Sequence, residues 1–200
     1  MIFIPRNLAL PTKKSAMPKI DERREFLPVN IAIMTVSDSR TFDDDKSGKV
    51  LVNRAEDAGH NIVDRVIVTD DEDLIRAQLK KWIADEGVEV VISTGGTGVT
   101  GRDVTPEAFE SVFEKHISGF GELFRMLSYE LIGTSTIQSR ATGGVANGTY
   151  MFALPGSPGA CRDGWDKILK DQLDSRFRPC NFVELLPRLK EHMIGHDHDH

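Results

Sequence analysis

The sequence predicts an α/β protein: a three-layer, doubly wound and mostly parallel sheet with helices on both faces and a small β-hairpin. Two observations predict this class. Short apolar runs rich in β-branched residues alternate with stretches of helical period, which is typical of parallel βαβ units. The 200 residues are 40% apolar, which is enough for one domain with a core of its own.

The first half of the chain shows the clearest alternation. Strands are expected over residues 30–36, 61–68 and 88–93, and the third is apolar enough to be covered on both faces. A helix from near Ser47 separates the first two strands. A second helix separates the last two, and its apolar stripe contains Ile75, Leu79, Trp82 and Ile83.

The second half predicts further helices and a hairpin. The hairpin joins strands over 139–145 and 149–154 through Ala146-Asn147-Gly148, a sequence typical of a tight turn. The apolar positions that mark the helices are Phe109, Val112 and Phe113, then Phe120, Phe124, Leu127 and Leu131, and finally Trp165, Ile168 and Leu169.

The two ends of the chain differ in composition from its middle. Residues 1–28 contain four prolines and mixed charge, so we predict an N-terminal arm rather than regular structure. The α/β domain is expected over 29–186. Residues 187–200 are expected to form a flexible tail rich in His and Asp, in which a functional metal site is the weaker interpretation.

Net charge and hydropathy exclude several classes of partner. A net charge of −6 argues against broad electrostatic binding to nucleic acid or to an anionic membrane. No apolar stretch approaches membrane-spanning length, and the first residues lack the continuous apolar core of a signal peptide. We therefore expect a soluble, cytoplasmic protein. Cys161 and Cys180 lack metal-ligand spacing and are expected to be reduced thiols.

A glycine-rich loop follows the third predicted strand, and residues 93–106 read S-T-G-G-T-G-V-T-G-R-D-V-T-P. Thr105 suits the N-cap of the next helix, and Pro106 suits its first position. Glycines let the backbone approach a ligand and direct its N–H groups at phosphate. The loop therefore predicts an anion site that also contains one acid, Asp103, and one base, Arg102.

Two familiar nucleotide motifs overlap this loop, and both fail in context. Residues 96–101 satisfy the dinucleotide pattern G-x-G-x-x-G, but the helix starts only near Thr105 and no acid ends a following strand at the required distance. The same stretch resembles a P-loop, but Arg102 and Asp103 stand where a P-loop needs Lys and then Ser or Thr. A dehydrogenase and a Walker-type NTPase are therefore disfavoured.

Ligands of open α/β sheets bind beyond the carboxyl ends of the strands. The segments expected there are residues 37–38, residues 70–71, the glycine loop and a second glycine loop at 155–159. Two phosphate-binding loops with Asp70 and Asp103 nearby suggest Mg²⁺ and a nucleotide, because Mg²⁺ is commonly held by one or two carboxylates plus substrate phosphates.

Four segments at these strand ends form a recognisable combination. They read Thr35-Val-Ser-Asp38, Thr94-Gly-Gly-Thr-Gly98, Arg102-Asp-Val-Thr-Pro-Glu-Ala108 and Leu154-Pro-Gly-Ser-Pro158. This combination resembles the MoaB/Mog family of molybdenum cofactor biosynthesis, over about residues 28–182. Stretches at 119–125, 133–136 and 178–182 are similar to the protein B branch of that family rather than to its Mog or gephyrin branch.

The resemblance implies a molybdopterin-binding, Rossmann-like fold and the adenylylation of molybdopterin. The terminal phosphate of the pterin would attack the α-phosphate of Mg-ATP, giving adenylyl-molybdopterin and pyrophosphate. The family's two essential aspartates fall on Asp70 and Asp103, as catalytic residues and Mg²⁺ ligands. The substrate-binding residues implied are Ser37, Thr94, Gly95, Gly96, Thr97, Gly98, Arg102, Gly156, Ser157, Pro158 and Gly159.

The implied partners are molybdopterin, ATP, other proteins of the same pathway and further copies of the chain. The resemblance implies a trimer, and the protein B branch implies a hexamer of two trimers. We expect apolar residues of the N-terminal arm to pack on a neighbouring copy and favour the hexamer. These residues are Ile2, Phe3, Ile4, Leu8 and Leu10.

Purely structural roles stay open for three of the site residues. Asp103 could cap a helix, Asp70 could complement a helix dipole, and Arg102 could face solvent. For the function, the alternative to an enzyme is a non-catalytic molybdopterin-binding or scaffold protein of the same pathway.

Two predictions concern residues outside the site. The acidic run at 43–45 is expected to be a solvated loop before a helix capped by Ser47. His60 and His116 are expected at the surface rather than as metal ligands.

Overall fold

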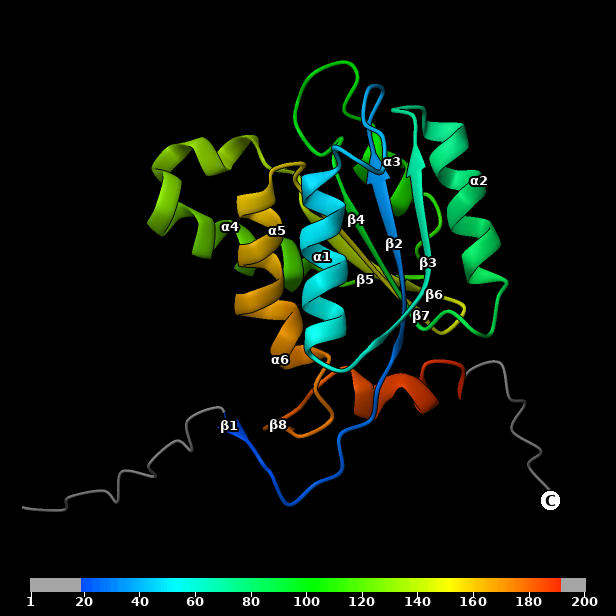
Figure 1. Ribbon diagram of the computed structural model, residues 1–200, viewed down its shortest axis with the longest axis vertical. Coiled ribbons are helices and arrows are strands. Elements are labelled where there is room, and N and C mark those ends of the chain that lie inside the picture. Colours follow the sequence, from blue (N-terminus) through cyan, green and yellow to red (C-terminus); the bar gives the residue numbers. More distant parts are fainter. Residues whose placement is uncertain (1–18, 192–200) are drawn as a thin grey trace, which may run out of the picture.

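The computed structural model describes residues 19–191 of the chain. Its middle layer is a six-stranded sheet with the order β3-β2-β4-β7-β6-β5 (Figure 1). The first four strands in this order are parallel, and β6 makes antiparallel pairs with β7 and β5. In chain order the strands are β2 (Asn30–Val36), β3 (Asn61–Val68), β4 (Val90–Thr94), β5 (Lys115–His116), β6 (Thr142–Ala146) and β7 (Thr149–Leu154).

Helices cover both faces of the sheet, which confirms the predicted three-layer α/β class (Figure 1). One face is covered by α1 (Lys46–Asp57), α4 (Ser118–Ile132) and α5 (Pro158–Gly164). The other face is covered by α2 (Glu72–Ile83) and α3 (Thr105–Glu110). The short helical segments are η1 (Gly133–Gln138), the π-helical η2 (Trp165–Leu169), α6 (Lys170–Gln172) and η3 (Val183–Arg188).

The strands are buried on both faces because alternate side chains point into two separate apolar clusters. On the central strand β2, Ile31 and Ile33 enter the cluster under α1, α4 and α5. Ala32 and Met34 enter the cluster under α2 and α3. This two-sided burial explains why β2, β4 and β7 are continuous apolar runs in the sequence.

The predicted hairpin forms between β6 and β7. Its turn contains Asn147 and Gly148, whose φ angles of 45° and 81° are both positive, as a tight hairpin turn requires. β6 begins at Thr142, later than the expected Ser139. The reason is that the preceding residue Arg140 directs its backbone N–H to the glycine loop instead of to β7.

Both predicted helix caps next to the site are wrong. Helix α1 is capped by Asp45 rather than Ser47, because the Asp45 carboxylate accepts the backbone N–H of Gly48. Asp45 is only 1% exposed, so the acidic run is not a wholly solvated loop. Thr105 is inside α3 rather than at its cap, because its hydroxyl donates to the carbonyl oxygen of Gly95.

His60 is buried, which corrects the expectation of a surface histidine, whereas His116 is exposed. The His60 ring packs between the rings of Phe26 and Trp165. Its Nδ1 accepts the backbone N–H of Val29 at 3.3 Å. Burial lowers the pKa of His60 to about 4, so the ring is neutral at pH 7 and belongs to the core.

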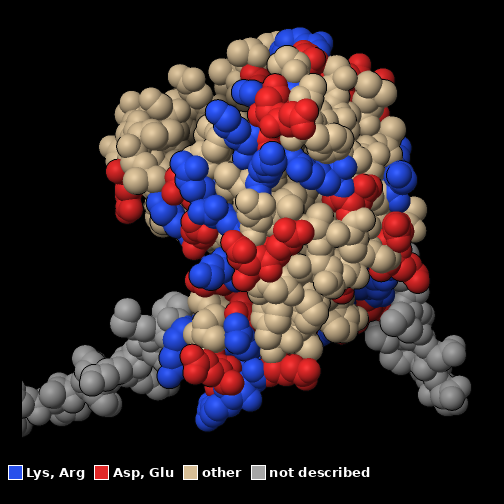
Figure 2. Space-filling model, viewed as in Figure 1, with Lys and Arg blue, Asp and Glu red and all other residues tan. Residues whose placement is uncertain are grey.

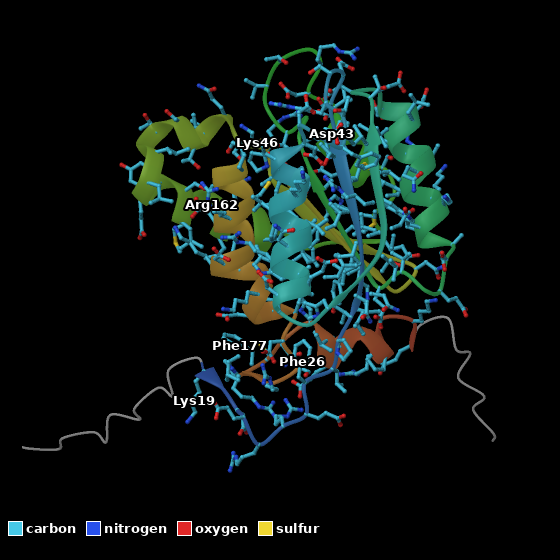
Figure 3. The ribbon with its side chains drawn as sticks, viewed as in Figure 1. Lys19, Phe26, Asp43, Lys46, Arg162 and Phe177 are labelled. Carbon is cyan, nitrogen blue, oxygen red and sulfur yellow. The ribbon has the colours of Figure 1, made fainter. Side chains whose placement is uncertain are left out.

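Residues 19–28 lie against the chain's own C-terminal segment. Strand β1 (Lys19–Ile20) pairs with β8 (Phe177–Arg178), and Figure 3 labels Lys19 and Phe177 on these two strands. Arg24 adds an ion pair with Glu184 of η3. The apolar residues expected to contact a neighbouring copy, and the histidines from residue 192 onward, lie outside the described residues.

None of the helices in residues 19–191 combines the length and the apolar character that a membrane span needs. Both cysteines are free: Cys161 is buried and Cys180 is exposed.

Candidate functional site

The parallel strands end at one edge of the sheet, so the loops that follow them meet there (Figure 1). The backbone N–H of Asp70, after β3, donates to the carboxylate of Asp38, after β2. The two glycine loops follow β4 and β7 and touch each other, since a Cβ on Gly156 would lie 3.2 Å from the Cα of Gly95. The segments predicted at this edge are therefore neighbours.

Two glycines of the first loop are required by the backbone. Gly95 has a φ of +104°, and a Cβ there would lie 2.2 Å from the carbonyl oxygen of Val36. Gly96 has a φ of +63°, and a Cβ there would lie 2.4 Å from Oγ1 of Thr105. An L side chain at either position would be strained and would displace the end of β2 or the start of α3.

The two predicted catalytic aspartates face this loop from different directions. A Cβ on Gly96 would lie 2.9 Å from Oδ1 of Asp70. A Cβ on Gly98 would lie 2.7 Å from Oδ2 of Asp103. Each carboxylate therefore lies beside a different glycine of the same loop.

Asp103 does not cap a helix. Its Oδ2 accepts the backbone N–H of Thr100 at 2.8 Å and the Thr100 hydroxyl at 2.6 Å, which closes the turn of the loop. Burial alone would raise the pKa of Asp103. The hydrogen bonds from Thr100 and Gly98, with the charge of Arg140, outweigh burial and lower that pKa.

Asp70 has the opposite electrostatic character. Burial raises its pKa, and the charges of Asp38 and Asp103 raise it further, against a smaller opposing effect of Arg102. The cap of α2 is its neighbour Asp71, which accepts the backbone N–H of Leu74. Asp70 is therefore not used as a helix cap, and it lines a cleft instead.

Arg102 lies in an ion pair rather than alone in solvent. Its guanidinium donates to both carboxylate oxygens of Asp38, with a shortest distance of 2.7 Å. Both side chains are largely exposed, so the pair bridges the loops after β2 and β4 at the surface. A ligand anion that binds Arg102 would compete with Asp38.

The second glycine loop is held by hydroxyl groups of neighbouring elements. Thr94 Oγ1 donates to the carbonyl of Pro155 at 2.9 Å, and Ser47 Oγ donates to that of Gly156 at 2.8 Å. Ser157 caps α5 by accepting the backbone N–H of Ala160. These contacts join β4, α1 and α5 around the loop.

Two clefts adjoin the glycine loops, and both are lined by Gly96 and Gly156. The first has a volume of about 540 Å³ and is lined by Asp103. The second has a volume of about 360 Å³ and is lined by Asp70. The two predicted catalytic aspartates therefore line different clefts, and these clefts share Gly96 and Gly156.

The structure distributes the predicted substrate-binding residues between these clefts. Gly96 and Gly156 line both clefts, and Arg102 lines neither of the two. Those that line the first are Thr97, Gly98, Ser157 and Gly159. Those that line the second are Ser37, Thr94, Gly95 and Pro158.

One wall of each cleft was not predicted from the sequence. Helix α4 and η1 contribute an apolar wall to the first cleft, which includes Phe124, Leu131 and Ile132. Phe124 and Leu131 belong to a helical apolar stripe that is ordinarily read as core. Arg40 and Lys46 add positive charge to the second cleft. No local motif distinguishes these two from other surface cations.

Asp45 fixes the start of α1 at the second cleft. Its Oδ2 accepts the hydroxyl of Thr35 at 2.7 Å and Nη2 of Arg65 at 2.8 Å, and its Oδ1 accepts Gly48 N–H at 2.8 Å. Burial would raise its pKa, but these donors outweigh burial and lower it. Figure 3 labels the adjacent Lys46, which is the first residue of α1.

The site offers two carboxylates rather than a complete metal centre. Within residues 19–191, no group of three or more His, Cys, Asp or Glu side chains is arranged to hold a metal ion. A Mg²⁺ ion fits this donor set only if ligand phosphates complete its coordination, which is the common arrangement for this ion.

The sequence and the fold match known proteins. A family model described as "Probable molybdopterin binding domain" matches residues 32–175. The chain belongs to this family. The match confirms the resemblance to the MoaB/Mog family and to its protein B branch.

Curated relatives of this molybdopterin-binding family are similar along most of the chain. Molybdenum cofactor biosynthesis protein B of Escherichia coli strain K12 is 55% identical over 84% of this chain and 96% of its own. The protein of that name from Bacillus subtilis strain 168 is 43% identical over 77% of this chain and 92% of its own.

Solved structures of the family share the fold. A crystal structure of molybdenum cofactor biosynthesis protein B has a TM-score of 0.73 at 42% identity and covers 75% of this chain and 94% of its own. The tungsten cofactor synthesizing protein MoaB from Pyrococcus furiosus has a TM-score of 0.65 at 36% identity, with coverages of 72% and 92%.

Proposed function

We propose that this chain, which acts in molybdenum cofactor biosynthesis, transfers AMP from ATP to the terminal phosphate of molybdopterin. A phosphate oxygen of the pterin forms a bond to the α-phosphorus of ATP. The bond from that phosphorus to the bridging oxygen of the β-phosphate breaks, and pyrophosphate leaves with the electron pair. The products are adenylyl-molybdopterin and pyrophosphate.

The observation that supports this proposal is the pair of clefts that share Gly96 and Gly156. A transfer between two phosphorylated compounds needs two binding compartments whose phosphates can meet. Gly96 and Gly156 line both clefts, so the phosphates of the two substrates would meet at the backbone of these two glycines. The apolar wall from α4 suits a flat heterocycle, whereas Arg40 and Lys46 suit phosphate groups.

The chain's own residues act by positioning and by charge. Loop N–H groups would bind phosphate oxygens, and Asp70 and Asp103 would hold a Mg²⁺ ion together with those oxygens. Bound Mg²⁺ supplies charge neutralisation and makes the α-phosphorus easier to attack. Phosphoryl-type transfer relies on such positioning rather than on a covalent nucleophile.

The direct test is incubation of the purified chain with molybdopterin, ATP and Mg²⁺, followed by separation of the products. We expect adenylyl-molybdopterin and pyrophosphate in equal amounts. If molybdopterin binds but no AMP is transferred, the chain is a non-catalytic molybdopterin-binding or scaffold protein. The absence of both binding and transfer would refute both functions.

A further inference from the structure

Arg140 connects the start of β6 to the glycine loop through its backbone and its side chain. Its backbone N–H donates to the carbonyl of Thr97 at 2.9 Å. Its Nε donates to the carbonyl of Gly98 at 2.6 Å, and its Nη2 donates to that of Asp103 at 2.7 Å. The guanidinium therefore bridges the two ends of the exposed turn at residues 99–102.

A third group orients this guanidinium. Its Nη1 forms an ion pair with Glu107, in the first turn of α3. A planar guanidinium has donors in fixed directions, so one that contacts a carboxylate and two carbonyls is held in a single orientation.

The same turn is closed from within by Asp103. Its carboxylate accepts the backbone N–H and the hydroxyl of Thr100, and its own N–H donates to the Thr100 carbonyl. The carboxylate of Asp103 is therefore fixed by Thr100, while its backbone carbonyl is fixed by Arg140. Loss of the second contact would let Asp103 move together with the turn.

We propose that Arg140 is a positioning residue that holds Gly98 and Asp103 in the geometry in which they face the first cleft before any ligand binds. Its effect on turnover rests on the proposed function, whereas its effect on the loop does not require a ligand. Preorganised groups avoid the cost of ordering a loop during binding and reaction.

The decisive variant is Arg140→Lys, which keeps the positive charge but cannot make the forked contacts. Arg140→Gln removes the charge as well. The matched control is Arg54→Lys, because Arg54 makes a bidentate pair with Asp166 between α1 and η2 rather than with the loop. Comparison of the first two variants separates the effect of geometry from that of charge.

Amide hydrogen exchange of the unliganded protein measures the loop directly. We expect the amides of Thr100 and Asp103 to exchange about tenfold or more faster in both Arg140 variants, with thermal unfolding close to that of the wild type. The Arg54→Lys protein should exchange these amides at the wild-type rate. Wild-type exchange in Arg140→Lys would overturn the proposal, because charge alone would then be sufficient.

Turnover gives a second readout. We expect Arg140→Lys to lower the rate of AMP transfer to molybdopterin about ten- to a hundredfold. In an Asp103→Asn background the same substitution should cause a much smaller loss than in the wild type, because Arg140 acts in part through Asp103. A full additional loss there would contradict the positioning role. If the wild type transfers no AMP but the loop loosens in Arg140→Lys, only the proposed function fails.

Discussion

Asp70 and Asp103 lie beside one loop but have pKa values displaced in opposite directions. Asp70 is partly buried and has carboxylate neighbours, so its pKa is raised. Asp103 receives several hydrogen bonds, so its charged form is favoured. Opposite displacements of neighbouring carboxylates are typical of functional sites, because each group is adapted to a different role.

Replacement of Asp103 by asparagine should separate binding from chemistry. Asp103→Asn keeps the shape of the side chain and an oxygen for Thr100, but it removes the negative charge. We expect AMP transfer to fall about a hundredfold or more, with molybdopterin affinity changed much less. Asp73→Asn, on the exposed start of α2, is the control that should retain activity. Normal adenylylation by Asp103→Asn would refute the assignment.

The raised pKa of Asp70 predicts the pH dependence of Mg²⁺ binding. Only the charged carboxylate binds the ion, and protonation begins at a higher pH than for an ordinary aspartate because the pKa is raised. We expect Mg²⁺-dependent nucleotide binding to weaken as the pH falls through this raised pKa. Titration calorimetry at a series of pH values measures the effect. If nucleotide binding by the Asp70→Asn protein weakens over the same pH range, another group is responsible.

Among the elements, the glycine loop between β4 and α3 depends on backbone conformation rather than on side chains. Gly95→Ala should destabilise the fold by about 1–3 kcal/mol, because the new Cβ meets the carbonyl of Val36 and the φ is positive. Gly101→Ala is the matched control in the same loop, since a Cβ there has no neighbour within 4 Å. Chemical denaturation measures both. Equal stability of the two variants would contradict the strain argument.

On the scale of the whole molecule, α4 and η1 form a lobe that stands out from the sheet (Figure 1). In Figure 2 this lobe, at the left of the view, shows almost no Lys or Arg. Its exposed apolar side chains are Leu123, Met126, Tyr129, Leu131, Ile132 and Ile137. A surface of this kind is typical of contacts between subunits.

We therefore expect the chain to assemble through this lobe; the resemblance to the family implies a trimer or a hexamer of two trimers. The double variant Met126→Asp with Ile137→Asp should shift it toward monomers, because burial of each apolar side chain contributes about 1–3 kcal/mol. Leu74→Asp, at an exposed apolar residue of α2, should leave the assembly unchanged. Light scattering coupled to size exclusion measures the mass. A monomeric wild-type protein would overturn this expectation.

A truncation tests the contribution of the N-terminal arm. Deletion of residues 1–17 leaves the pairing of β1 with β8 intact. We expect this deletion to convert hexamers into trimers without unfolding the α/β domain. An unchanged mass would exclude the arm from the assembly.

The layers of the fold and the edge at which the site lies could be predicted from the sequence. Strands β2 and β3 have the predicted bounds. Two-sided burial leaves a continuous apolar pattern in β2, whereas β3 is a partly exposed edge strand that is recognised by its β-branched residues. The glycine loop could also be located from the sequence, because its backbone has a positive φ at Gly95 and Gly96, a conformation that favours glycine. The parallel order of the strands then places Asp70 and Asp103 at the same edge.

The side chains that support that loop could not be predicted from the sequence. Arg140 contacts residues about forty positions away along the chain, Asp45 at the start of α1 meets Arg65 of β3, and His60 is buried by Phe26 and Trp165. Periodicity and capping rules describe neighbours along the chain, whereas these contacts depend on how separate elements pack. The apolar wall of the first cleft also depends on packing between separate elements, because α4 lines this cleft together with the glycine loop.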